Sequence, residues 1–114
     1  MEPISDIDKK LLKACRAFAA ASAQEALDQG ADVNAQDEHG MTALHHAAAK
    51  GARPCVRLLV ASGKCDYLLR DNWGRYAYEL AIEWGRDYAV ARLLMRKQAQ
   101  QAHKQGVPAY VLPS

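Results

Sequence analysis

The sequence has few of the residues that mark most other classes of small protein. Three cysteines among 114 residues are an odd and sparse set, which argues against a disulfide framework and favours a reducing compartment. No apolar run approaches the roughly 20 residues that cross a bilayer. The acidic start of the chain, interrupted by Pro3, does not resemble a secretory signal peptide. We therefore expect a cytoplasmic protein with no membrane partner.

A strong excess of one charge is also missing. The formal net charge is +2, divided as −2 over residues 1–36, +2 over 37–70 and +2 over 71–114. A dedicated nucleic-acid binder carries a much larger basic excess, usually gathered on one face. The charge therefore argues against nucleic acid as the main partner, and a chain of this length has room for one small domain only.

Patterns that carry catalysis or bind metal are absent from the sequence. His45 and His46 are adjacent, so on a helix their side chains point about 100° apart and do not form the i, i+4 pair that binds zinc. The cysteines lack the C-x-x-C spacing of zinc and redox sites. We therefore predict no enzyme, no cofactor and no metal, with buried structural thiols and a partly exposed packing role for His46.

What the sequence does contain is an internal repeat of 34 residues. The segment Gly-Met-Thr-Ala-Leu-His-His-Ala-Ala at 40–48 recurs as Gly-Arg-Tyr-Ala-Tyr-Glu-Leu-Ala-Ile at 74–82. A fixed period of this length is typical of arrays in which each unit stacks on its neighbours. In the clearest unit, Thr42 is placed to cap a first helix, and Pro54 lies in the first turn of a second.

These residues resemble the ankyrin-repeat family. The family pattern is Asp-x-x-Gly-x-Thr-Pro-Leu-His-x-Ala-Ala-x-x-Gly, followed by a helix rich in Val and Leu and by Gly-Ala-Asp-Val-Asn-Ala. Residues 37–51 match the first part, with Ala43 in place of the proline, and residues 30–35 match the closing segment in full. The resemblance implies an all-α solenoid of about three stacked helix-turn-helix units, linked by β-hairpin-like turns. It also implies that the ring of His45 makes a structural hydrogen bond to nearby backbone.

The repeat pattern divides the chain into four segments. We expect an N-terminal capping ankyrin repeat over 1–36, a full repeat over 37–70, a C-terminal capping repeat over 71–98, and a helix extension with a tail over 99–114. Phe18 falls where the other units have glycine. Because a bulky residue is costly in the left-handed conformation, we predict a different turn there. The apolar residues of the tail favour its docking on the last helix.

The resemblance also implies where a partner binds. Ankyrin-like proteins generally use the concave side, through hairpin tips and the exposed face of each first helix. Both tryptophans of this chain fall on variable positions of that side, and Trp and Arg often dominate the binding energy of interfaces. The predicted partner-binding residues are His39, Met41, Lys50, Arg70, Trp73, Arg75 and Trp84.

Two alternatives stay open. In a terminal repeat, the tryptophans could instead cover the exposed flank, or stack on Arg70 or Arg75 as cation–π pairs. The basic residues of the C-terminal region could bind nucleic acid or an acidic surface, although Glu79, Glu83 and Asp87 oppose this; they are Arg86, Arg92, Arg96, Lys97 and Lys104. The primary hypothesis is a non-catalytic module that binds a partner protein, as a scaffold or regulator, with self-association as a second mode of binding.

Overall fold

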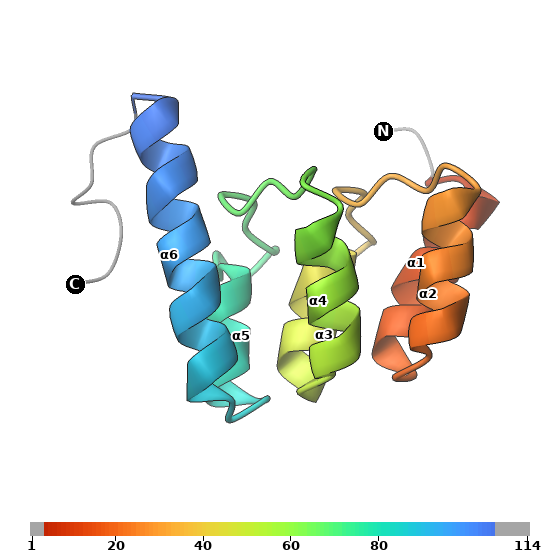
Figure 1. The fold of residues 1–114 in the computed structure, drawn as a ribbon, viewed down its shortest axis with the longest axis horizontal. Coiled ribbons are helices and arrows are strands. Elements are labelled where there is room, and N and C mark those ends of the chain that lie inside the picture. The colour runs from red at the N-terminus through yellow and green to blue at the C-terminus, as the bar shows by residue number, and fades with distance from the viewer. Residues whose placement is uncertain (1–3, 107–114) are drawn as a thin grey trace.

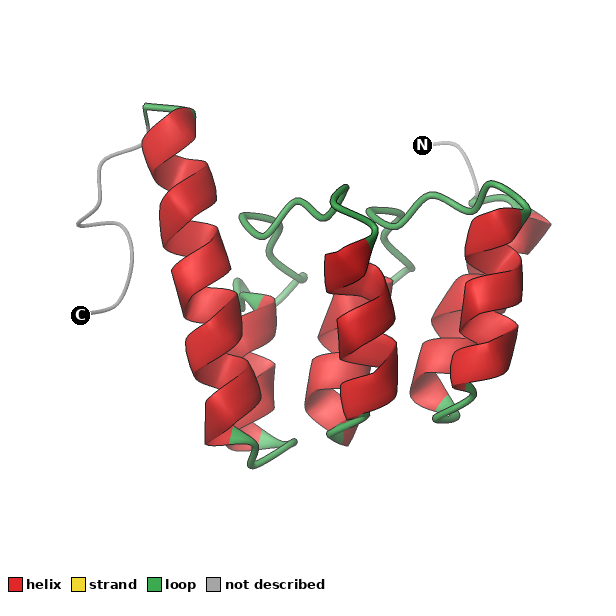
Figure 2. Ribbon diagram, in the orientation of Figure 1, coloured by secondary structure: helices red, strands yellow, loops and turns green. Residues whose placement is uncertain are grey.

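Residues 4–106, which this computed structural model describes, form six helices arranged as three helix-turn-helix pairs (Figures 1 and 2). The first helices of the pairs are α1 (Asp6–Arg16), α3 (Ala43–Lys50) and α5 (Ala77–Glu83). The second helices are α2 (Ala20–Asp28), α4 (Arg53–Ala61) and α6 (Tyr88–Lys104). No strand is found within this range.

The helices form two layers. In the first layer α3 packs against both α1 and α5, and in the second α2 packs against α4. Figure 1 views the array from the side of the second layer. The buried alanines Ala14, Ala47 and Ala81 line the first helices, and such small side chains let helices of neighbouring units approach closely. The predicted all-α solenoid of three stacked units is confirmed.

The connections between the pairs end in two matching hairpin tips. In the tip at 37–41, the amide of Asp37 donates to the carbonyl oxygen of Met41 at 3.0 Å, and the Asp37 carboxylate accepts from the Met41 amide at 3.0 Å. The tip at 71–75 repeats both bonds around Asp71. A short acidic side chain that bonds to its own backbone in this way closes a tight turn. The predicted β-hairpin-like turns are therefore present.

The prediction that the turn at Phe18 differs from the equivalent turn of the next helix pair is wrong. Phe18 does not change its turn, because it adopts φ 61°, close to the φ 69° of Gly51. Its exposed side chain limits the cost to the backbone strain of the left-handed region. In the third pair the left-handed residue is Arg86, at φ 50°, and not Gly85. Glycine is needed at Gly85 for space, since a Cβ there would lie 2.2 Å from the carbonyl oxygen of Ala48.

The last helix is longer than its counterparts, with 17 residues in α6 against nine in α4. Its final turns are docked, because Gln98 and Ala102 are buried and Gln101 hydrogen bonds to the loop at 65–67. The predicted docking of residues 107–114 falls outside the described part of the chain. Among the described helices, none has both the length and the apolar character that crossing a membrane requires.

Candidate protein-binding surface

Three of the predicted binding residues meet at the hairpin tips. His39 and Trp73 occupy equivalent positions of the two tips, and their ring centroids lie 5.8 Å apart. The guanidinium carbon of Arg75 lies 5.2 Å from the centroid of the Trp73 ring, within the range of a cation–π contact. Trp73 nevertheless keeps 64% of its surface exposed. We call His39, Trp73 and Arg75 the tip cluster.

Hydrogen bonds between the two tips hold this cluster in place. The amide of Asn72 donates to the carbonyl oxygen of His39 at 2.9 Å. The side-chain amide of Gln36 donates to the carbonyl oxygens of Gly40 and Arg70, at 2.8 and 3.0 Å. A Cβ at Gly40 would lie 2.5 Å from the side-chain oxygen of Asn72, so the tips touch directly. The tip cluster therefore sits on two turns that are fixed to each other.

Arg70 and Met41 flank the tips without joining the cluster. Arg70 donates from Nη2 to the hydroxyl of Tyr76 at 2.7 Å, and its guanidinium lies 4.7 Å from the centroid of that ring. Its aromatic partner is therefore Tyr76. Met41 is half-buried and packs against the hydrophobic core, so it offers only part of its side chain to a partner.

Lys50 and Trp84 form a separate group at the far end of the first helices. Lys50 is the last residue of α3, and Trp84 directly follows α5. The two positions are equivalent in neighbouring units, and both side chains are exposed, with Trp84 at 67%. Because α5 has seven residues and a helix rises about 1.5 Å per residue, this pair lies roughly one length of α5 from the tip cluster. The predicted residues thus form two groups.

His45 is buried below the tips and joins two units. Its Nε2 lies 3.0 Å from the carbonyl oxygen of Arg75, and its Nδ1 lies 2.8 Å from the hydroxyl oxygen of Thr42. A carbonyl oxygen only accepts, so Nε2 carries the proton and Nδ1 accepts from the hydroxyl. Burial lowers the pKa of His45 below its usual value, which keeps the ring neutral. The predicted structural hydrogen bond of His45 is confirmed.

His46 departs from its predicted, partly exposed role, because only 7% of its surface is exposed. Its Nε2 lies 2.8 Å from Oδ2 of Asp37, and this partner makes the burial of a polar ring acceptable. Burial lowers the pKa of His46, and the nearby Asp37 offsets only part of that effect. Burial also acts to raise the pKa of Asp37, but hydrogen bonds from His46 and from backbone amides outweigh it and hold that pKa low.

The thiols show no sign of reactivity. Cys15, Cys55 and Cys65 are free and buried, as predicted for structural cysteines. Burial raises the pKa of Cys15 to about 12 and that of Cys65 to about 11, and a protonated thiol is a poor nucleophile. Within residues 4–106 there is no group of three or more His, Cys, Asp or Glu side chains that could hold a metal ion.

The family model described as ankyrin repeats in many copies matches residues 27–81. Ankyrin repeat domain-containing protein 37 of Mus musculus is 40% identical over 80 residues, which cover 70% of this chain and 50% of that protein. The chain is an ankyrin-repeat protein. Ankyrin repeats generally mediate contacts between proteins, so this ankyrin array belongs to a class of protein-interaction modules.

Two further relatives show how much of a longer protein such an array occupies. Ankyrin repeat domain-containing protein 37 of Bos taurus is 44% identical over 59 residues, 52% of this chain and 37% of that protein. Putative glutaminase 2 of Caenorhabditis elegans is 35% identical over 81 residues, 69% of this chain but only 13% of that protein. The chain therefore spans half or less of the length of these relatives. The activity in the glutaminase name is that of the whole relative, and this ankyrin array matches 13% of its length.

Proposed function

We propose that this ankyrin array is a non-catalytic module that binds a partner protein through its hairpin tips and concave face, with the tip cluster at the centre. The observation that supports this most is the state of Trp73, which is exposed yet held by contacts with His39 and Arg75. An aromatic side chain fixed before binding loses little conformational entropy when a partner covers it. Exposed, preorganised tryptophan is therefore well suited to anchor a partner.

Arg75 adds a directional polar contact to the cluster. Its Nε donates to the Asp71 carboxylate at 2.8 Å, which fixes the plane of the guanidinium. Its two Nη groups make no hydrogen bond within the described residues, and they suit a carboxylate or carbonyl oxygen of a partner. We expect the partner to place an apolar side chain on Trp73 and an acceptor beside Arg75.

The remaining predicted residues extend the proposed surface. Met41 and Arg70 flank the tips, and Lys50 with Trp84 would provide a second point of contact at the other end of the first helices. A standard interface buries about 800 Å² per partner, and an array of three units offers a face near or below that size. We therefore expect moderate affinity, and the same exposed groups would also serve for self-association.

The test compares Trp73→Ala/Trp84→Ala with the wild type and with Tyr88→Ala as matched control. Tyr88 is 62% exposed but lies on α6, in the second layer. Proteins retained from a lysate by each immobilised variant are quantified, and the affinity for the retained protein is then measured by titration. Losing each anchor should cost about 2 kcal/mol of binding free energy, whereas Tyr88→Ala should bind like wild type. Equal retention by all three proteins, or loss of cooperative unfolding in the double variant, would overturn the proposal.

Self-association through this face has a simpler test. Light scattering over a range of concentrations gives the mass of the particle, and a wild-type dimer should dissociate in the Trp73→Ala/Trp84→Ala variant. A dimer that survives in the variant would assign self-association to another surface, while a monomer at all concentrations leaves a different protein as the partner.

A further inference from the structure

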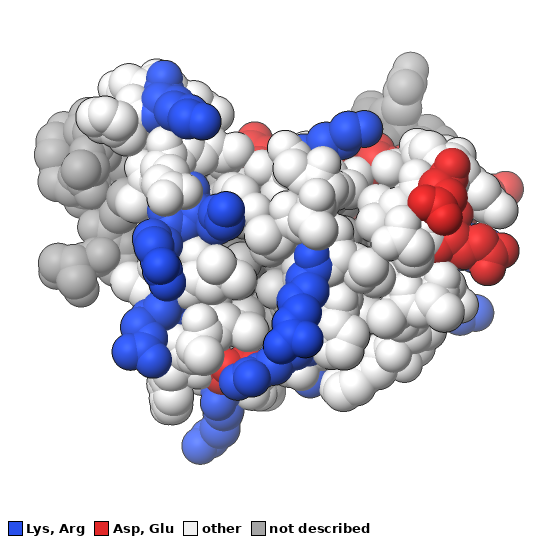
Figure 3. Space-filling model, viewed as in Figure 1, with Lys and Arg blue, Asp and Glu red and all other residues white. Residues whose placement is uncertain are grey.

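The second layer is divided by charge. Every Asp, Glu, Lys or Arg within α4 and α6 is basic: Arg53, Arg57, Arg92, Arg96, Lys97 and Lys104. The charged residues of α2 are both acidic, namely Glu25 and Asp28. Figure 3 shows the result, with basic side chains gathered over α4 and α6 and acidic side chains at the opposite end of the array. The small net charge of the whole chain conceals this separation.

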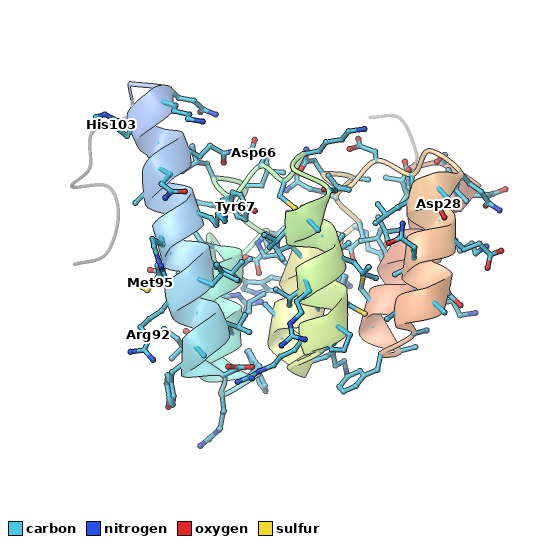
Figure 4. The ribbon with its side chains drawn as sticks, in the orientation of Figure 1. Asp28, Asp66, Tyr67, Arg92, Met95 and His103 are labelled. Carbon is cyan, nitrogen blue, oxygen red and sulfur yellow. The ribbon has the colours of Figure 1, made fainter. Side chains whose placement is uncertain are left out.

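The basic side chains of α4 and α6 form two columns with uncharged surface between them (Figure 3). On α6, Leu93, Lys97 and Lys104 share one side, since residues separated by 4 and 11 positions lie near the same face of a helix. Figure 4 shows Arg92 and Met95 projecting from the side of α6 away from α4. Lys97 is five residues beyond Arg92 and therefore about 140° around the helix from it, toward α4.

Within residues 4–106, most of this charge lacks an acidic partner. Arg53 is neutralised by Asp87, with Nη2 and Oδ1 2.9 Å apart. The ion pairs of the described residues do not include Arg57, Lys97 or Lys104. We call Arg57, Leu93, Lys97 and Lys104 the outer basic surface. Among the described residues, it combines positive charges that form no ion pair, on two neighbouring helices, with a half-buried leucine on the same side of α6 as the two lysines.

We propose that the outer basic surface binds an acidic amphipathic helix of a partner protein. The nine residues of α4 and the 17 of α6 extend about 14 and 25 Å, which matches a helix of roughly 10 to 16 residues. Such a helix would lay its apolar stripe on Leu93 and its Asp and Glu side chains along the two basic columns. The site lies in the second layer, so it is independent of the tip cluster.

Three features favour an acidic helix over nucleic acid. The basic surface ends at the acidic side chains of α2, which would repel a long phosphate backbone. It offers few cations, whereas proteins that depend on phosphate contacts often use about 6 to 10 of them. Tyr88, the exposed aromatic residue of α6, lies about 180° around the helix from Lys97, so it is not placed to stack a base beside that lysine.

The test uses a defined probe and two variants with the same change in charge. The probe is a fluorescent 16-residue peptide with leucines at helical i, i+3 and i+4 spacing and glutamates elsewhere, and its binding is followed by anisotropy. Arg57→Glu/Lys97→Glu alters the outer basic surface. The matched control is Lys9→Glu/Lys13→Glu, which changes two exposed residues of α1, in the first layer. We expect at least a tenfold loss of affinity in the first variant and less than a threefold loss in the control.

Two comparisons make the outcome decisive. A peptide of the same composition with its leucines and glutamates rearranged should bind at least tenfold more weakly, because it presents no apolar stripe. A 16-base-pair DNA duplex should bind more weakly than the acidic helix at the same salt concentration. Equal losses in both variants, no binding of the peptide, or tighter binding of the duplex would overturn the proposal. Trp73→Ala/Trp84→Ala should still bind the peptide, so failure here and failure of the tip cluster are distinguishable.

Discussion

His45 and Arg75 link neighbouring repeats through one buried hydrogen bond, from the imidazole Nε2 to the backbone carbonyl oxygen at 3.0 Å. The bond requires a neutral ring that carries its proton on Nε2. It also reaches the same hairpin tip that presents Trp73 and the Arg75 side chain. The protonation state of a buried histidine is therefore coupled to the geometry of the proposed binding surface.

The first prediction concerns the dependence of stability on pH. The pKa values of His45 and His46 are lowered in the folded state, while in the unfolded chain each lies near 6.5. Below about pH 6.5 the unfolded chain therefore binds protons that the folded chain does not, and the free energy of unfolding must fall. Urea denaturation between pH 8 and 5 should show a plateau above pH 7 and a decline below 6.5.

The aspartates of the two tips predict a further fall in the free energy of unfolding, at lower pH. The pKa values of Asp37 and Asp71 are lowered in the folded state, so their stabilisation is present above about pH 4 and is lost as the pH falls through the folded pKa values.

A variant of His46 tests the decline near pH 6. His46→Leu introduces the residue type that the next unit has at the equivalent position, Leu80, and it should reduce this decline. The surface variant His39→Gln should retain it. A free energy of unfolding that stays constant from pH 8 to 5 would contradict the lowered pKa values of His45 and His46.

The sequence predicts the helix pairs and the tips well because their signals are local. Thr42 caps α3 by accepting from the His45 amide at 3.2 Å, and the glycines fall at the turns. The burial of His46 was not predictable from its own position, since its partner Asp37 is nine residues earlier and is brought close only by the fold of the tip. A signal existed nonetheless, because the equivalent residue of the next unit is Leu80, an apolar residue.

The sequence predicts which residues belong to the candidate surface, but it does not predict how they are arranged in space. The repeat pattern identifies variable positions, and Trp73 and Trp84 are exposed there. It does not give the distance along a first helix, so it does not reveal that the tip cluster and the Lys50–Trp84 pair are two separate groups. The charge separation of the second layer was hidden for a related reason, since net charge per segment adds α5, which carries Glu79 and Glu83, to α6.

The second prediction concerns the two indoles directly. Trp73 and Trp84 are 64% and 67% exposed, and they are the tryptophans of the chain. The emission maximum of the folded protein should therefore lie close to that of the chain unfolded in urea, and acrylamide should quench both states to a similar degree. Single variants, Trp73→Phe and Trp84→Phe, separate the two signals. A clear blue shift in the folded protein would mean that an indole is covered, and self-association should then be measured in the same sample.

The third prediction concerns backbone strain at Phe18. A non-glycine residue in the left-handed region costs roughly 1–2 kcal/mol, and the exposed Phe18 side chain recovers little of that by burial. Glycine removes the strain but adds about 0.5–1 kcal/mol of conformational entropy cost on folding. Phe18→Gly should therefore raise the free energy of unfolding by up to about 1 kcal/mol. Phe18→Ala, which keeps a Cβ at φ 61°, should give no gain, and a loss in the glycine variant would contradict the strain argument.

The fourth prediction concerns Gln101, whose side chain closes the C-terminal end of the array. Its Oε1 accepts from the Tyr67 amide at 2.7 Å, and its Nε2 donates to the carbonyl oxygen of Cys65 at 2.9 Å. No repeat pattern in the sequence points to a glutamine in this role. Gln101→Ala leaves both groups without the side chain that pairs them, which should cost about 1–3 kcal/mol of stability.

Two measurements separate this role of Gln101 from a general effect on α6. Urea denaturation gives the loss of stability, and hydrogen exchange should show faster exchange of the Tyr67 amide in Gln101→Ala, because that amide loses its acceptor. The control is Gln100→Ala, which changes the exposed neighbouring residue and should alter stability by less than about 0.5 kcal/mol. If both variants lose the same stability, the effect comes from the helix itself and the extension of α6 does not act as a cap through this side chain.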